Sequence, residues 1–158
     1  MRNPGKYGRV DFLPPEMTVQ WVKKPYLDQP PIWCSVDLRD GNQALPIPMS
    51  TEEKLDYFHL LLNLGFQEIE VGFPAASNTE FSFVRLLIEE GHIPNGVAIQ
   101  VFSQAREHII QRTFEAVEGA KNVIFHLCSP TSPAHRDLVL HHSQEEVFQS
   151  KIRSLSPL

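Results

Sequence analysis

Four short apolar runs alternate with longer amphipathic segments, and this alternation limits the folds open to the chain more than any other feature. The expected strands are residues 33–38, 68–73, 97–102 and 122–127, and the expected helices are residues 51–64, 78–90 and 105–117. A further helix is expected to begin after Ser143. Strands that alternate with helices in this way are typical of a parallel sheet with right-handed crossovers. The chain is therefore predicted to be an α/β protein.

The first expected helix carries clear start and stop signals. Ser50 precedes it and Glu53 follows three residues later, which is the pattern of a capping box. Leu55 and Phe58 then recur at helical spacing until Gly65 supplies a stop. This segment is predicted to be a helix over about residues 51–64.

Two architectures fit the alternation: a doubly wound sheet and a (β/α) barrel. Residues 40–49, after the first strand, lack the G-x-G-x-x-G of a dinucleotide-binding turn, and no G-x-x-x-x-G-K-[ST] occurs in the chain. This absence favours a TIM (β/α)8-barrel type. A complete barrel needs eight strands and at least about 200 residues, so only the first four βα units are present. The inner faces of the first and fourth strands are therefore predicted to be abnormally exposed.

The chain is expected to divide into three parts. Residues 1–32 form a Pro-rich N-terminal arm, because proline at this density disrupts helices and sheets alike. Residues 33–150 form the half-barrel, and residues 151–158 form an irregular tail that continues no unit.

Composition excludes several classes of partner. The net charge of -5 comes from dispersed acidic residues without a Lys/Arg stripe, which argues against nucleic acid. No apolar run approaches the roughly 20 residues of a membrane span, and residues 1–13 do not resemble a signal peptide. A cytoplasmic location is therefore expected. Cys34 and Cys128 lie in apolar runs and are expected to be buried, reduced and structural.

Arg39 and Asp40 stand at the end of the first strand, where barrel enzymes place catalytic groups. Strict alternation would send their side chains to opposite faces of the strand. Both can therefore reach the active-site end of a barrel only if the strand breaks at Asp40. Gly41 makes such a break plausible. Asp40 could then bind a divalent cation while Arg39 stabilises negative charge on an oxygen. The alternative is a surface ion pair in a turn.

Three blocks in order along the chain resemble the 2-isopropylmalate synthases, members of the pyruvate carboxyltransferase-like, DRE-TIM metallolyase superfamily. They are CSVDLRDGNQAL at residues 34–45, EIEVGFPAAS at 68–77 and FHLCSPTSPAHR at 125–136. The resemblance runs from about residue 33 to 147. It implies a Claisen-type condensation of acetyl-CoA with 2-oxoisovalerate in leucine biosynthesis. It also implies a divalent metal cation (Mg, Mn or Zn) and a homodimer for the full-length enzyme.

The resemblance assigns roles to residues at the strand ends. Asp40 resembles the metal-ligand aspartate, Arg39 the arginine that stabilises the enolate and keto oxygens, and Gln43 a glutamine beside the site. A 2-oxo acid can chelate a divalent ion through its carboxylate and keto oxygens, which polarises the carbonyl. These residue types therefore suit the implied chemistry.

Residues of the later strands complete the implied site. Glu70 lies in a buried run, where an ionised carboxylate needs a partner. The resemblance makes it a pocket residue, and the alternative is a salt bridge that merely orients Arg39. His126 is implied to contact the oxo acid, with a hydrogen-bonded core histidine as the alternative. Thr131 and Ser132 are weaker candidates for substrate hydrogen bonds. Solvated loop positions are expected for three other histidines: His135, His141 and His142.

The chain departs from the family's pattern in two ways. Cys128 and Ser129 stand where tyrosine and asparagine usually occur, which loosens that part of the pocket. The H-x-H pair that supplies two more metal ligands is absent, together with the acid/base region and the regulatory domain. The chain alone is therefore expected to be inactive, because one carboxylate does not hold a catalytic ion. A non-catalytic remnant, a half-barrel that needs a second chain, and a homocitrate or citramalate synthase remain as alternatives.

Overall fold

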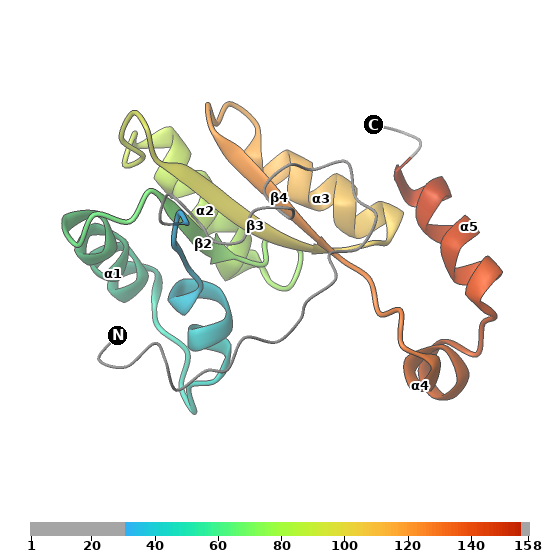
Figure 1. Cartoon of the computed structure of the whole chain (residues 1–158). Coiled ribbons are helices and arrows are strands. Elements are labelled where there is room, and N and C mark those ends of the chain that lie inside the picture. The colour runs from blue at the N-terminus through green and yellow to red at the C-terminus, as the bar shows by residue number, and fades with distance from the viewer. Residues whose placement is uncertain (1–30, 156–158) are drawn as a thin grey trace, which may run out of the picture. The chain divides into compact units, whose positions relative to one another are not determined.

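Four parallel strands form one sheet in the order in which they occur in the chain (Figure 1). The computed structural model describes residues 31–155. Its strands are β1 (Cys34–Ser35), β2 (Glu68–Gly72), β3 (Ala98–Gln104) and β4 (Val123–Cys128). Each strand pairs in parallel with the next. The last three expected strands are thus confirmed within two residues at each end.

Helices follow the strands as expected. They are α1 (Thr51–Asn63), α2 (Asn78–Glu89), α3 (Glu107–Val117), the short α4 (Pro133–His135) and α5 (Gln144–Leu155), with π-helical segments η3 (Asp37–Gly41) and η4 (Arg136–Leu140). The capping box of α1 is present, because the Glu53 N–H donates to Ser50 Oγ at 3.2 Å and Glu53 Oε2 accepts from the Ser50 N–H at 2.8 Å. Each of the three expected helices is confirmed.

The C-terminal end of the described chain differs from expectation. An irregular tail was expected from residue 151, but α5 continues through Leu155. The first residues of α5 already form helical turns, and propagating a helix adds one hydrogen bond for each residue fixed. The expected Pro-rich arm falls almost entirely on residues 1–30, which lie outside the described residues.

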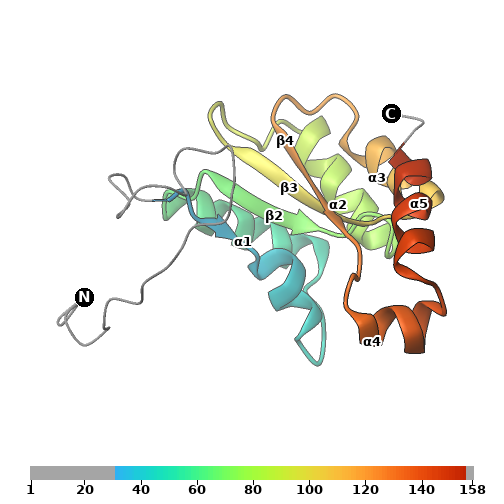
Figure 2. The same cartoon turned by 45° about the vertical axis from the view of Figure 1, so that its right-hand side comes forward.

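The helices α1, α2 and α3 lie on one face of the sheet in both views (Figures 1 and 2). Each contacts the next, and α3 also contacts α5. A doubly wound sheet carries helices on both faces, whereas a TIM barrel carries all of them outside. The sequential strand order and the one-sided helix layer confirm four βα units of a partial TIM barrel.

The hydrophobic core lies between the sheet and these helices. Strand alternation sends Ile69 and Val71 of β2, and Ile99 and Val101 of β3, into this core, where all four are fully buried. The helices contribute the fully buried Phe58, Phe83, Val84 and Leu87. The same alternation places the residues between them on the opposite face, which becomes the inside of a barrel.

That opposite face is open along β4. Every residue of β4 is at least partly exposed, whereas β2 is buried from Ile69 onward. On the inner face of β4, Ile124 and His126 are half-buried and Cys128 is exposed, and on that of β1, Cys34 is half-buried. Cys128, expected to be buried, is exposed at the end of β4, and both cysteines are free thiols.

The first strand is shorter than the expected residues 33–38 and ends at Ser35, well before Asp40. The Asp40 N–H donates to Val36 O at 2.9 Å, which begins the turn of η3. Ser35 Oγ donates to Asp37 Oδ2 at 2.6 Å and accepts from the Asp37 N–H at 3.4 Å. Such local side-chain bonds compete with strand pairing and favour the turn.

Candidate active site

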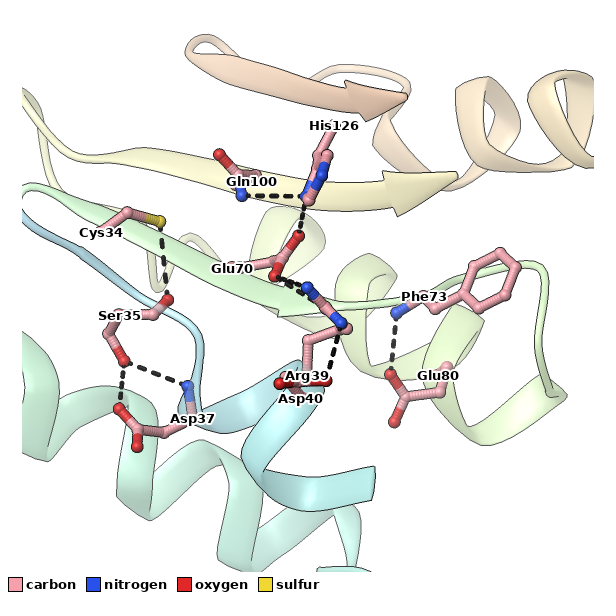
Figure 3. A network of polar contacts seen from close by, with 10 residues as sticks. All are labelled: Cys34, Ser35, Asp37, Arg39, Asp40, Glu70, Phe73, Glu80, Gln100 and His126. Carbon is pink, nitrogen blue, oxygen red and sulfur yellow. Dashed lines mark hydrogen bonds and ion pairs between the residues drawn. The ribbon is translucent and has the colours of Figure 1, made fainter. Parts of the chain in front are cut away.

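A fully buried carboxylate on the inner face of β2 organises the polar groups of this region (Figure 3). Glu70 Oε2 accepts from Arg39 Nε at 2.8 Å and also lies 2.8 Å from Arg39 Nη2 as an ion pair. The turn of η3 places Arg39 over the sheet, while its neighbour Leu38 is fully buried in the core. Because a buried carboxylate is costly unless paired, this two-point ion pair explains how Glu70 is tolerated.

His126 of β4 holds the other oxygen of the same carboxylate. Its Nδ1 lies 2.7 Å from Glu70 Oε1 and 3.5 Å from Gln100 Nε2 of β3. The short contact to an ionised carboxylate requires a proton on Nδ1, so the amide of Gln100 cannot also donate to that atom. Nε2 of His126 is left as the second functional nitrogen on a ring that is 40% exposed. Glu70 therefore fixes the orientations of Arg39 and His126 together.

Two phenylalanine rings lie beside this network on the inner face of the sheet. Phe102 of β3 makes edge-to-face contacts with Phe73 at 5.0 Å and with His126 at 5.2 Å between ring centroids. The Arg39 guanidinium carbon lies 4.9 Å from the Phe102 ring centroid. A guanidinium with a carboxylate on one edge and an aromatic face beside it loses little freedom when it binds a further anion.

Asp40 lies at the exposed side of the network. Its carboxylate is 68% exposed, and Oδ1 accepts from Arg39 Nη1 at 3.0 Å. The residue could serve as one ligand of a divalent cation. Among the described residues, no group of three or more His, Cys, Asp or Glu side chains could hold a metal ion. At this network, the described residues therefore offer one ligand and not a complete metal site.

The structure brings together Arg39, Asp40, Glu70 and His126, but Glu70 and His126 lie inside their strands rather than after them. Gln43 is exposed to solvent.

The other two candidates lie in the segment after β4. Ser132 Oγ accepts from the His135 N–H at 3.2 Å and so caps the short α4. Thr131 contributes its backbone oxygen to Arg136 Nη1. All three histidines expected in solvated positions are exposed: His135, His141 and His142.

Two residues of the network were not singled out from the sequence, Gln100 and Phe102. Both belong to the expected third strand and stand two positions apart, so alternation alone puts them on one face. What places them beside the site is the parallel register, which aligns Gln100 with Glu70 and Phe102 with His126.

A second buried ion pair lies beneath the carboxyl end of β2. Lys54 of α1 has a fully buried side chain, and its Nζ lies 2.7 Å from Glu80 Oε1 of α2 and 4.4 Å from the Phe83 ring centroid. Glu80 Oε2 accepts from the Phe73 N–H at 3.1 Å. Burial lowers the pKa of Lys54, and the hydrogen bond and charge of Glu80 oppose that shift. This pair links two helices to the segment that carries the Phe73 ring.

Cys34 belongs to β1, the strand that pairs with β2, which carries Glu70. Burial, followed by the negative charges of Glu70 and Glu68, raises the pKa of the Cys34 thiol. A thiol in this environment is a poor nucleophile, which argues against a catalytic role.

Within residues 31–155, no helix is long and apolar enough to cross a membrane.

Comparison with known proteins gives consistent results. The HMGL-like family model matches residues 30–155. A 2-isopropylmalate synthase of Desulfitobacterium hafniense is 54% identical over 94% of this chain and 27% of its own length. A 2-isopropylmalate synthase of Helicobacter hepaticus is 58% identical over 90% of this chain and 25% of its own length, and one of Corynebacterium efficiens is 53% identical over 86% and 25%. The chain thus spans about a quarter of the length of the curated relatives it matches.

The HMGL-like match covers β1 to α5, the same part of the chain that folds as four successive βα units with the Arg39–Glu70–His126 network on their open face. This chain therefore belongs to the HMGL-like family.

Proposed function

We propose that this chain is the N-terminal part of the catalytic barrel of a cytoplasmic 2-isopropylmalate synthase, which condenses acetyl-CoA with 2-oxoisovalerate. The relatives named above carry that name at 53 to 58% identity. The observation that carries the proposal is the buried Glu70 held between Arg39 and His126 on the open face of the sheet. This arrangement offers a fixed cation and an imidazole to one small anionic substrate.

Arg39 is the group that would bind the oxo acid. Glu70 pairs with its Nε and Nη2, and Asp40 accepts from Nη1, so one N–H of Nη1 and one of Nη2 are left to bind a substrate anion. A carboxylate or a developing oxyanion on the substrate is stabilised by such preorganised donors. His126 would hydrogen-bond the substrate through Nε2, since Glu70 occupies Nδ1.

Charge balance explains why a divalent cation would be needed. Arg39 already shares its positive charge with two carboxylates, Asp40 and Glu70, so by itself it would attract an anionic oxo acid only weakly. Asp40 would supply one ligand to Mg²⁺, Mn²⁺ or Zn²⁺, and such an ion would polarise the keto oxygen. The other ligands would have to come from outside the described residues.

It follows that the 158-residue chain alone should not turn over substrate. Weak binding of the oxo acid through Arg39 is compatible with this proposal. The full-length enzyme is proposed to be a homodimer with acetyl-CoA as co-substrate. A homocitrate or citramalate synthase would differ in the oxo acid accepted, and a non-catalytic remnant would lack activity in any context.

A chimera separates these possibilities. The matched quarter of the Desulfitobacterium hafniense relative is replaced by this chain, and release of free coenzyme A is followed with acetyl-CoA and added divalent metal. Turnover should be highest with 2-oxoisovalerate, compared with 2-oxoglutarate and pyruvate. Asp40→Ala and Arg39→Lys in the chimera should each abolish most of it, whereas Glu115→Gln on the exposed face of α3 should not.

Faster turnover with 2-oxoglutarate or pyruvate would show that the enzyme prefers that oxo acid to 2-oxoisovalerate. A folded chimera without turnover on any of the three would support the remnant. Full activity after Asp40→Ala would show that the metal ligand is assigned wrongly.

A further inference from the structure

Two histidines outside the network join α1 to the segment that follows α2. His59 lies on α1, and His92 comes two residues after Glu90, the C-cap of α2. His59 Nε2 and His92 Nδ1 are 3.3 Å apart, and the two ring centroids are 5.1 Å apart. Both residues are half-buried. The two imidazole nitrogens therefore converge in a partly enclosed position that solvent still reaches.

The separation of these nitrogens suits a shared metal ion. At 3.3 Å the contact is long for a hydrogen bond between the two rings. Two Zn–N bonds of about 2.0–2.1 Å that meet at a tetrahedral angle place their nitrogens about 3.3–3.4 Å apart. His59 Nε2 and His92 Nδ1 are thus spaced like two ligands of one tetrahedral ion.

The surroundings of His92 favour a cation. Its other nitrogen, Nε2, lies 3.1 Å from Glu90 Oε2, the carboxylate partner that metal-binding imidazoles commonly have. The site lies at the C-terminus of α2, where the helix dipole is negative and the last turn carries no basic residue. The single cation of α2, Arg85, is held by Glu89 and by the carbonyls of Ala116 and Glu118.

We propose that His59 and His92 chelate a borderline divalent cation such as Zn²⁺ or Cu²⁺, with Glu90 orienting His92. No third protein ligand occurs among the described residues, so water would complete the coordination and the affinity would be below that of structural zinc sites. Imidazole pairs do not favour Mg²⁺, so this site would differ from the one proposed at Asp40. The bound ion would fasten α1 to the end of α2, and the inference does not depend on the proposed function.

The test is titration of the untagged 158-residue chain with ZnCl₂ by calorimetry, in a Cys128→Ser background that removes the exposed thiol. One Zn²⁺ per chain is expected, with no comparable signal from MgCl₂. Glu90→Gln should weaken Zn²⁺ binding about 10- to 100-fold, the usual effect of losing such a carboxylate partner. His59→Asn and His92→Asn should each weaken it further. The double variant His141→Asn with His142→Asn removes an exposed histidine pair and should leave affinity unchanged.

Circular dichroism of each variant checks folding. CoCl₂ gives a readout on the parent chain without a substitution at the site, because tetrahedral Co²⁺ absorbs visible light strongly. Absence of saturable Zn²⁺ binding, or of a tetrahedral Co²⁺ spectrum, would overturn the proposal. So would unchanged binding in folded His59→Asn, or loss of binding in the His141 and His142 control.

Discussion

Replacing Glu80 with glutamine should destabilise the chain strongly, because Lys54 would keep a charge in the core without its partner. The Lys54 side chain is fully buried and that of Glu80 is 17% exposed. Removing one partner of a buried ion pair costs about 3–5 kcal/mol. We expect about 3 kcal/mol, the lower end, because the glutamine oxygen can still accept one hydrogen bond, and the Phe83 ring still faces the ammonium group.

The loss should become smaller as pH rises. Burial lowers the pKa of Lys54, and Glu80 opposes that shift, so Glu80→Gln should lower the folded-state pKa further. Between this lowered pKa and the ordinary value of 10.5, the unfolded chain binds more protons than the folded chain. Stability therefore rises with pH in that window, which is wider in the variant. The difference in unfolding free energy between parent and variant should shrink from pH 7 towards pH 10.

Urea unfolding followed by circular dichroism measures both effects, provided that the transition is cooperative. Glu89→Gln is the matched control, since it removes an exposed i,i+4 pair on the same helix and should change stability by about 0.5 kcal/mol or less. A loss for Glu80→Gln no larger than this control would refute the reasoning. A loss that grows with pH would refute the assignment of the effect to Lys54.

Three further outcomes are expected. Limited alkylation analysed by mass spectrometry should modify the exposed Cys128 faster than Cys34, whose raised pKa leaves less thiolate at pH 8, whereas equal rates in the folded chain would contradict this environment. Leu38→Ala should lower the unfolding free energy by about 2–5 kcal/mol in urea, because Leu38 is fully buried in the core. Gly72→Ala should lower the melting temperature, because a Cβ there would overlap Glu80 Oε2 and disturb the Lys54 pair, and an unchanged value would show that Glu80 moves freely.

Local patterns in the sequence predicted most of the elements. The capping box of Ser50 and Glu53 and the helical spacing that follows depend on residues within a few positions, so α1 was predicted almost to the residue. The first strand was predicted too long, because the bonds between Ser35 and Asp37 that start the turn of η3 are not visible in hydrophobicity. The pattern of apolar residues also did not indicate that residues 151–155 continue α5.

The chemical character of the candidate site also follows from the sequence, but its geometry does not. Arg39, Asp40, Glu70 and His126 could be chosen as polar residues at or within the expected strands. Which of them touch depends on strand register, since Arg39 and Glu70 are 31 positions apart and Glu70 and His126 are 56 apart. Local propensity carries no information over such separations.

The sequence by itself therefore determined the α/β alternation, the boundaries of most elements and the residue types of the site. Only the tertiary structure decided that one carboxylate, Glu70, holds both Arg39 and His126, and that Lys54 is buried against Glu80. The physical reason is that hydrogen bonds within turns and helices form between near neighbours in the chain, whereas these ion pairs exist only after parallel strands and their covering helices have packed.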